Sequence, residues 1–321
     1  MDFFPSLEEG GTEKLGSRRH DSYRHLLKAE NCRMKVNKAV ILAAGMGTRM
    51  LPSSKVIPKE ILPVVDTPAI QVVVEEAVAS GIEEIVIVVS PGKTTVVEHF
   101  NCNAELERHL EERGKNEILE IVRRSNNPAK ISIAEQAKPL GLGHAVLQAR
   151  AAVGDAPFAV MLPDDIFDCP RPCLRQLLDA AETRDAPVVA LLKVARSEIS
   201  KYGIADARPV GERVYELHGM VEKPAPEKAP SEFAIMGRYV LTPDIFALLA
   251  EGKPGAGGEI QLTDALMALT KRRKVYGYEF EGVRYDLGDR VGFISAQVGF
   301  GLKRPELADR LRAFLKSVIS E

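Results

Sequence analysis

The stretch KAVILAAGMGTRMLPSSKVIPKE, from Lys38 to Glu60, decides the fold expected for this chain. Its first part, Ala39 to Ala44, is a short apolar run with β-branched members, which is typical of a buried parallel strand. Gly45 and Gly47 follow at once, and glycines at a strand end let the backbone approach a ligand and direct N–H groups at phosphate. The stretch therefore predicts a nucleoside triphosphate site at the edge of an α/β sheet.

Cationic side chains follow the two glycines closely. Arg49, Lys55 and Lys59 can neutralise several phosphate charges together. The dinucleotide fingerprint G-x-G-x-x-G would need a glycine where Met50 stands, and a P-loop ending at Gly92-Lys93-Thr94 would need one at Ile87. We therefore interpret Gly92-Lys93-Thr94 as the loop after a strand, and the remaining pattern is G-x-G-T-R followed by P-K-E.

Length and composition describe an ordinary globular chain. A chain of 321 residues with 45% hydrophobic and 27% charged residues can form one elaborated α/β domain, or one and a half domains. A formal net charge of -2 gives no general attraction to nucleic acid or to a membrane, and no apolar run suggests a membrane span or signal core. The four cysteines form no paired metal motif, so we expect free thiols and a cytoplasmic protein.

Strands and helices alternate after Lys38. This rhythm predicts a Rossmann-like α/β fold, with a mostly parallel mixed sheet covered by helices. The expected strands are 82–89, 130–135, 158–162 and 187–194, and the expected helices are 68–80, 143–152, 173–183 and a charged stretch over 96–124. Beyond Tyr202 we expect shorter strands in a smaller subdomain, and then an amphipathic terminal helix from Leu302 to Ile319.

Three polar or glycine positions directly follow expected strands. Gly45, Gln136 and Asp164 come after the strands that end near residues 44, 135 and 162. Ligands of such sheets bind outside the carboxyl ends of the strands. We therefore expect one cleft to collect all three residues.

The order of short motifs over residues 37–315 resembles that of the sugar nucleotidyltransferases, also called sugar-nucleotide pyrophosphorylases. Besides G-x-G-T-R and P-K-E, the motifs are Gly141-Leu142-Gly143-His144-Ala145, Leu162-Pro163-Asp164-Asp165, Tyr202-Gly203, Val221-Glu222-Lys223-Pro224, Gly237-Arg238-Tyr239 and Gly258-Glu259-Ile260-Gln261-Leu262-Thr263-Asp264. The last of these motifs and the charged insertion after Phe100 are most similar to the bacterial branch that uses UTP and glucose 1-phosphate.

The resemblance implies a reaction and its cofactor. A glucose 1-phosphate oxygen attacks the α-phosphorus of UTP by direct in-line displacement, with Mg²⁺ present and pyrophosphate leaving. Such a reaction depends on positioning and charge neutralisation, and it needs no nucleophilic side chain. The resemblance also implies a homo-oligomer, either a dimer or a tetramer, with no nucleic acid or membrane partner.

The chain is expected to divide into parts. Residues 1–36 form a polar extension that we expect to be disordered, with Met34 as a possible native start. The nucleotidyltransferase domain covers residues 37–321. Its nucleotide-binding part is expected over 37–195, and its sugar-binding part with the terminal helices over 196–321.

Residue roles on the nucleotide side also come from the resemblance. Arg49 and Lys59 lie along the triphosphate, where charge builds on the departing pyrophosphate. Gln136 pairs with the uracil edge, for which its amide offers both a donor and an acceptor. The other expected nucleotide-binding positions are Ala44, Gly45, Gly47, Thr48 and Gly141. His144, at an expected helix start, is assigned no catalytic role.

The expected metal ligands are two aspartates. Asp164 follows a strand and offers a hard oxygen to Mg²⁺, while Asp165 either shares that role or caps the next segment. The second carboxylate of the family pattern matches Asp286, for which helix capping is the alternative.

The expected sugar site lies in the second part of the chain. Glu222 accepts from two hydroxyl groups, Lys223 pairs with the sugar phosphate and serves catalysis, and Gly203 lets the backbone meet the hexose ring.

Two other functions remain open from the sequence. The same reaction with dTTP would use the same cradle, so the choice of base is the less constrained part. A catalytically silent paralogue that binds sugar nucleotides and regulates a partner would not need Arg49, Lys59, Asp164, Glu222 and Lys223 together.

Overall fold

The computed structural model describes residues 34–126, 128–252, 255 and 258–319. Residues 35–321 form one unit of the chain. The extension that we expect to be disordered, residues 1–36, lies almost entirely outside the described residues. Among the helices of the described part, none is long and apolar enough to cross a membrane.

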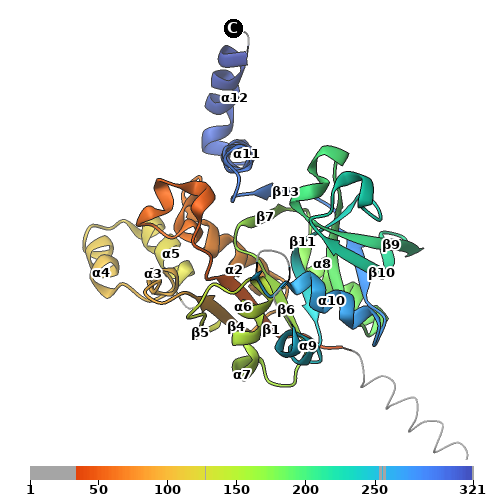
Figure 1. The fold of residues 1–321 in the computed structure, drawn as a ribbon. Helices are drawn as coiled ribbons and strands as arrows, with labels where there is room; N and C mark the ends of the chain where they lie inside the picture. Colours follow the sequence, from red (N-terminus) through yellow and green to blue (C-terminus); the bar gives the residue numbers. More distant parts are fainter. Residues whose placement is uncertain (1–33, 127, 253–254, 256–257, 320–321) are drawn as a thin grey trace, which may run out of the picture. The chain divides into compact units, whose positions relative to one another are not determined.

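The centre of this unit is a large mixed sheet (Figure 1). Within the described residues its strands are, in spatial order, β5 (Lys130–Glu135), β4 (Glu84–Val89), β1 (Lys38–Ala43), β6 (Phe158–Met161), β11 (Phe233–Leu241), β8 (Val188–Lys193), β12 (Tyr276–Glu279), β10 (Val214–Glu222) and β9 (Gly203–Gly211). Strands β5, β4, β1 and β6 are parallel, as are β8 and β12, whereas β11, β10 and β9 pair with their neighbours antiparallel. The predicted helix-covered mixed sheet is confirmed.

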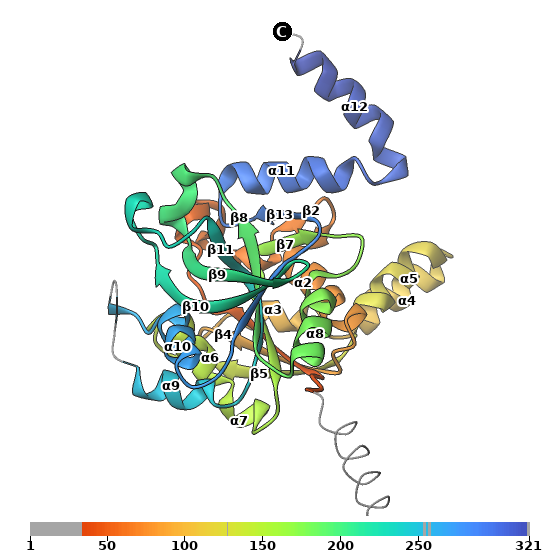
Figure 2. The same cartoon turned by 90° about the vertical axis from the view of Figure 1, so that its right-hand side faces the viewer.

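Helices cover both faces of the sheet (Figure 2). On one face lie α6 (Leu142–Gln148), α9 (Ile245–Glu251) and α10 (Leu262–Thr270), and on the other lie α2 (Ala69–Ala79) and α8 (Cys173–Arg184). Alternate residues of β1 face opposite sides, and Val40 and Leu42 join the same buried cluster as Val146 of α6 and Leu266 of α10. This burial on both faces explains the continuous apolar run of β1.

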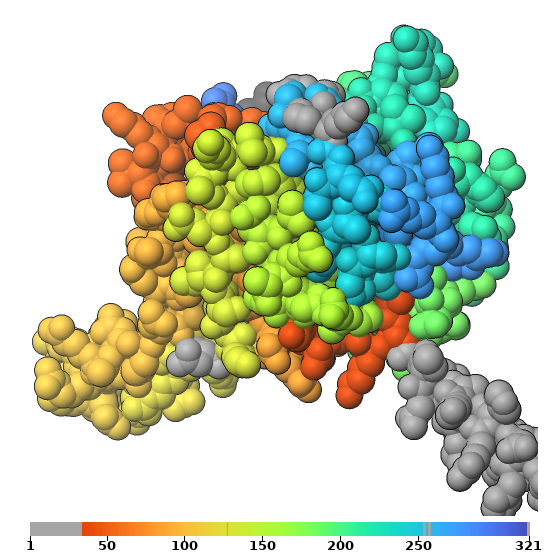
Figure 3. Space-filling view, turned by 60° about the horizontal axis from the view of Figure 1, so that its bottom comes forward, coloured from red at the N-terminus to blue at the C-terminus, as the bar shows by residue number. Residues whose placement is uncertain are grey.

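The remaining elements are short or peripheral. Figure 3 views the face where α6 and α7 lie beside α9 and α10, with α4 and α5 (yellow) at its side. The additional helices are α3 (Thr95–Glu98), α4 (Ala104–Glu112), α5 (Asn116–Ser125), α7 (Arg150–Val153), α11 (Arg290–Gly301) and α12 (Pro305–Ile319). Short 3₁₀ helices are η1 (Thr48–Met50), η2 (Ser53–Lys55), η3 (Lys59–Ile61), η4 (Arg196–Lys201) and η5 (Pro226–Lys228). Two small antiparallel pairs are β2 (Pro63–Val64) with β3 (Thr67–Pro68), and β7 (Asp165–Asp168) with β13 (Val283–Asp286).

Two expectations need correction. The charged stretch 96–124 is not one helix but parts of α3, α4 and α5, because the Asn103 side chain caps the start of α4 and Gly114 adopts a positive φ of 64° after it. The first three strands after Tyr202 are longer than expected: β9, β10 and β11 each have nine residues and belong to the large sheet, whereas β12 and β13 have four residues each. The boundary between a nucleotide part and a sugar part near residue 195 stays a prediction.

Candidate active site

The loop after β1 owes its shape to Gly47. This residue has a positive φ of 65°, and its carbonyl accepts a 2.7 Å hydrogen bond from the Ser54 hydroxyl. A Cβ at position 47 would lie 3.1 Å from that of Ser54, so the left-handed backbone favours glycine here and the packing leaves little room for a side chain. At Gly45, by contrast, the nearest atom to an added Cβ is Cε of Lys59 at 3.8 Å. The fold itself leaves room for a side chain at Gly45, which is the condition expected where a ligand approaches the backbone.

Two cations of this loop converge on Asp164. Lys59 Nζ lies 2.5 Å from Asp164 Oδ2, and the more exposed Arg49 lies 3.9 Å from the same oxygen. Burial disfavours the charged form of Asp164, but the neighbouring Lys59 and Arg49 outweigh it and hold the pKa of the carboxyl below its usual value. Burial would lower the pKa of Lys59, and Asp164 raises it instead. Both groups therefore carry their charges at neutral pH.

Asp165 points away from these cations and into a structural network. Its carboxylate accepts from the Gly237 N–H at 2.8 Å and from the guanidinium of Arg284. A Cβ at Gly237 would lie 2.6 Å from Asp165 Oδ2, which explains the glycine of the Gly237-Arg238-Tyr239 motif. Burial, together with the nearby Asp164 and Asp286, raises the pKa of Asp165 despite Arg284. These contacts favour a structural role for Asp165.

The fully buried Arg238 stabilises the turn between β6 and β7. Its guanidinium pairs with Glu76 at 2.6 Å and donates to the carbonyls of Leu162 and Asp165, each at 3.0 Å. A buried cation with this many acceptors fixes the main chain around it. The position of Asp164 at the tip of the turn follows from this arrangement.

Asp286 lies beside Asp164 through main-chain pairing. Strand β13 pairs Asp286 with Asp165 of β7, and the N–H of Leu287 donates to the Asp164 carbonyl at 2.7 Å. The Asp286 side chain accepts from the Gly288 N–H at 2.9 Å and lies 3.2 Å from Arg284. The cap of α11 is Asp289, which accepts from Gly292, so Asp286 does not cap that helix.

Gln136 is held in place by its amide nitrogen. This atom donates to the Gly141 carbonyl at 3.1 Å and lies 2.9 Å from Nδ1 of His144. The second ring nitrogen of His144 contacts Gln148, one turn further along α6. Both of these contacts use the nitrogen of the Gln136 amide, so they orient the group and leave its carbonyl oxygen as the atom to meet a ligand. His144 therefore orients Gln136, a role that the sequence did not suggest.

The predicted sugar-side residues meet at the end of β10. Glu222 accepts a 2.7 Å hydrogen bond from the hydroxyl of Thr263, and Lys223 Nζ lies 3.4 Å from Glu222. An added Cβ at Gly203 would lie 3.1 Å from both Glu222 and Thr263. Lys223 itself has a positive φ of 45°, which is uncommon for a residue with a side chain and often marks a functional site.

These groups line two adjoining cavities. The larger, of about 410 Å³, is lined by Ala44, Gly45, Thr48, Arg49, Lys59, Gln136, Gly141 and Asp164 among others. The smaller, of about 190 Å³, is lined by Arg49, Asp164, Gly203, Glu222, Lys223 and Asp286 among others. Arg49 and Asp164 belong to both, so they stand where the cavities join. Gly45, Gln136 and Asp164 share one cavity, as the strand ends predicted, whereas Gly47 lines neither and shapes the loop behind.

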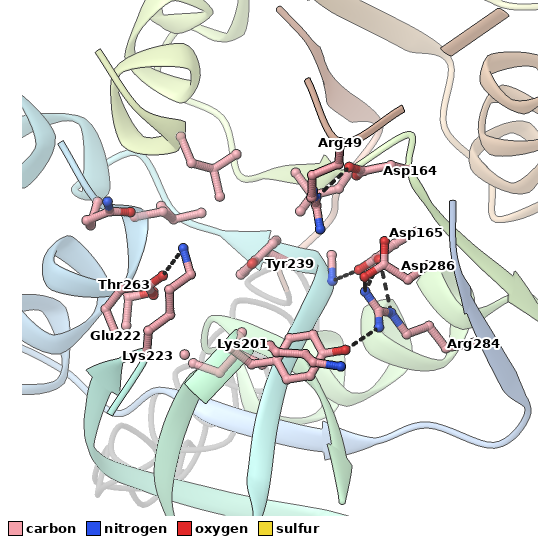
Figure 4. Close-up of a pocket in the computed structure, with 18 residues that line it drawn as sticks. Arg49, Asp164, Asp165, Lys201, Glu222, Lys223, Tyr239, Thr263, Arg284 and Asp286 are labelled. Carbon is pink, nitrogen blue, oxygen red and sulfur yellow. Dashed lines mark hydrogen bonds and ion pairs between the residues drawn. The ribbon is translucent and has the colours of Figure 1, made fainter. Parts of the chain in front are cut away.

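Figure 4 shows the smaller cavity, with Arg49 and Asp164 on one side and Glu222, Lys223 and Thr263 on the other. It also shows Arg284, which the sequence analysis missed. Its guanidinium joins Asp165 and Asp286 and donates to the Tyr202 hydroxyl at 3.0 Å. The sequence could have indicated Arg284, because it lies two residues before Asp286 on a short strand and alternate side chains of a strand share a face.

The nucleotidyl transferase family profile matches residues 38–300, which is more than half of the chain. The chain belongs to the nucleotidyl transferase family. A UTP–glucose-1-phosphate uridylyltransferase of Bacillus subtilis strain 168 is 48% identical over 287 residues, covering 89% of this chain and 98% of that protein. The resemblance predicted from the motifs is confirmed.

Solved structures of similar proteins support the assignment of this chain to the nucleotidyl transferase family. A UDP-glucose pyrophosphorylase complexed with UDP-glucose is 41% identical, with a TM-score of 0.78 over 84% of this chain and 100% of that one. A UTP-bound UGPase from Acinetobacter baumannii is 37% identical, with a TM-score of 0.81 over 88% of this chain and 99% of that one.

Proposed function

We propose that this nucleotidyl transferase transfers a uridylyl group from UTP to glucose 1-phosphate, giving UDP-glucose and pyrophosphate. The observation that carries the proposal is the position of Arg49 and Asp164 at the junction of the two cavities. A nucleotide in the larger cavity and a sugar phosphate in the smaller one would meet there. The family relationship supports the same reaction.

The nucleotide is assigned to the larger cavity. Main-chain groups of Ala44, Gly45 and Gly141 contact it, and Gln136 accepts from the uracil N3–H through its carbonyl oxygen. The orientation of the Gln136 amide by Gly141 and His144 supports this direction of the hydrogen bond. Gly47 and Thr48 shape the loop that covers the phosphates, since Gly47 sets its turn and Thr48 lines the cavity.

The sugar phosphate is assigned to the smaller cavity. Glu222 accepts from hexose hydroxyl groups, the backbone of Gly203 meets the ring, and Lys223 pairs with the phosphate. The hydrogen bond from Thr263 to Glu222 supports this assignment, because it holds one carboxylate oxygen and directs the other toward Lys223.

Asp164 and Asp286 fit a divalent cation, and we propose Mg²⁺. The N–H of Leu287, which directly follows Asp286, donates to the Asp164 carbonyl, and both aspartate side chains line the smaller cavity. Mg²⁺ is commonly held by one or two carboxylates together with substrate phosphates and water, so a two-carboxylate set suits it. When bound, it would neutralise negative charge on the substrate phosphates.

The residues of this chain act by positioning and charge. The glucose 1-phosphate oxygen forms a bond to the α-phosphorus while the bond from that phosphorus to the pyrophosphate oxygen breaks. Lys59 and Arg49 stabilise the charge that moves onto pyrophosphate, and Lys223 holds the attacking phosphate in line. The low pKa of Asp164 keeps this carboxylate charged, so it is not a general base in this scheme.

Pyrophosphate release tests the reaction and the base together. Purified protein with Mg²⁺ and glucose 1-phosphate is expected to release pyrophosphate far faster with UTP than with dTTP. Faster release with dTTP would assign the thymidylyl reaction. Nucleotide binding without release from either substrate would instead assign the silent regulatory paralogue.

We also propose that the protein is a cytoplasmic homo-oligomer that self-associates through α11 and α12. Helix α12 extends away from the sheet (Figure 1), and large apolar side chains stay exposed on both helices, including Val291 at 71% and Phe314 at 62%. The free thiols of Cys102, Cys169 and Cys173 fit a reducing compartment. Light scattering should give a dimer or tetramer mass that Phe314→Glu reduces; a monomeric wild-type protein would contradict self-association.

A further inference from the structure

Lys93 contacts the loop after β1, and it has no role in the proposed reaction. It follows β4, and its ammonium group donates to the carbonyl of Ala43 at 3.3 Å, to the carbonyl of Gly45, and to Glu60 Oε2 at 3.3 Å. An ammonium group has three N–H donors, and each finds one of these acceptors. The side chain is largely buried, at 18% exposure. Lys93 thus joins three segments: the loop after β4, the end of β1 and η3.

The carbonyl directions fix the directions of two amide groups. In a trans peptide the C=O of one residue and the N–H of the next point to opposite sides. Because the Ala43 and Gly45 carbonyls point to Lys93, the N–H groups of Ala44 and Met46 point away from it. Ala44, Gly45 and Met46 line the larger cavity, and Lys93 lines neither cavity described above. The two N–H groups therefore face the side on which the nucleotide is proposed to bind.

The carboxylate of Glu60 forms an ion pair with the ammonium group of Lys93. Its neighbour Lys59 reaches forward to Asp164, whereas Glu60 turns back into the protein and its side chain is fully buried. Among the buried side-chain atoms of the described residues, Glu60 Oε1 is left without a hydrogen-bond partner. A buried carboxylate with an unbonded oxygen is costly, and its retention needs a specific reason. The Lys93 ammonium, which Glu60 holds against the two carbonyls, provides that reason.

We propose that Lys93, held by Glu60, is a positioning residue for UTP binding: it fixes the Ala43–Met46 main chain so that the Ala44 and Met46 N–H groups are ready to donate to the nucleotide. Lys93 acts through the loop and does not touch the substrate. The inference rests on the proposed assignment of this loop to the nucleotide.

Lys93→Met tests the inference, because methionine keeps most of the side-chain volume and removes the three donors. We expect the Kd for UTP, measured by calorimetry, to rise about 10- to 100-fold, since hydrogen bonds from a charged group are lost. The KM for glucose 1-phosphate, measured at saturating UTP, should change by less than about twofold. This split between substrates would not arise from a general loss of stability.

Lys38 offers a matched control at the other end of β1. Its ammonium donates to the carbonyls of Ala152 and Val153, each at 3.3 Å, and lies 3.8 Å from Glu84. Lys38→Met removes a comparable set of contacts far from the nucleotide loop and should leave the Kd for UTP unchanged. Equal weakening of UTP binding by both variants would overturn the positioning role, as would an unchanged Kd in folded Lys93→Met protein.

Two further variants keep the test decisive. If Lys93→Met does not fold, Glu60→Gln, which keeps shape and removes the ion pair, should still raise the Kd for UTP severalfold; no change would overturn the inference. Gly45→Ala tests the underlying assignment, because an added Cβ would meet no atom of the fold closer than Cε of Lys59 at 3.8 Å. Unchanged UTP binding in Gly45→Ala would remove the nucleotide from this loop, whereas weakened binding in Gly45→Ala with normal binding in Lys93→Met would overturn the role of Lys93 alone.

Discussion

The two sides of the active site differ in how far the protein prepares them before substrate arrives. On the phosphate side Lys59 is 15% exposed and lies 2.5 Å from Asp164, while on the sugar side Lys223 is 59% exposed and lies 3.4 Å from Glu222. The first lysine is held by burial and a close carboxylate, and the second stands in solvent on a strained backbone. A preorganised cation costs little reorganisation during reaction, whereas an exposed one gains its order from the ligand.

Because the phosphate side is the more preorganised of the two, we expect substitution of Asp164 to cause the largest loss of turnover. Asp164→Asn removes a proposed metal ligand and leaves the buried Lys59 without its counter-charge. We expect kcat to fall on the order of 10³-fold, since several kcal/mol of charge stabilisation are lost. Steady-state kinetics over a range of Mg²⁺ concentrations measures the effect.

Asp155→Asn is the control for this variant, because Asp155 is exposed and precedes β6, whereas Asp164 follows it. It should keep wild-type turnover. Full activity in correctly folded Asp164→Asn protein would place the metal elsewhere and remove the proposed difference between the two sides.

On the sugar side we expect a loss of substrate affinity. Lys223→Ala removes the partner of the sugar phosphate and should raise the KM for glucose 1-phosphate about 30- to 100-fold, while the KM for UTP stays within about twofold. Kinetics with each substrate varied in turn separates the two constants. Lys228→Ala, an exposed lysine on η5, is the matched control. An unchanged glucose 1-phosphate KM in Lys223→Ala would end its assignment.

The smallest effect is expected at Thr263, which orients Glu222 and makes no ion pair. Thr263→Val keeps the shape and removes the 2.7 Å hydrogen bond to the carboxylate. The KM for glucose 1-phosphate should rise about 5- to 10-fold, in line with one hydrogen bond to a charged group. Thr270→Val, at the other end of α10, should have no such effect, because the Thr270 hydroxyl donates to the carbonyl of Met267 within the same helix. A larger loss of UTP affinity than of glucose 1-phosphate affinity would contradict the division of the cavities.

Secondary structure was predicted well where one local signal dominated. The apolar run before Gly45 became β1, and the stretch 130–135 became β5 with the same bounds. The charged stretch 96–124 was predicted less well, because its helical period continues across Asn103 and Gly114, where a cap and a positive φ interrupt it. The length of β9 and β10 was underestimated, since both strands are exposed along part of their length and lack the continuous apolar run of β1. Strand β11 is buried on both faces, but Gly237 and Arg238 interrupt its apolar run.

The sequence by itself determined the fold class, the family and the side chains that gather at the ends of the parallel strands, because each depends on contiguous motifs. Only the tertiary structure decided what holds these side chains in place. Arg284 reaches Asp165 across 119 positions of sequence, Thr263 reaches Glu222 across 41, and Lys93 reaches Gly45 across 48. Such contacts arise when strand pairing and helix packing bring distant segments together, and no local pattern of residue types specifies which polar groups then meet.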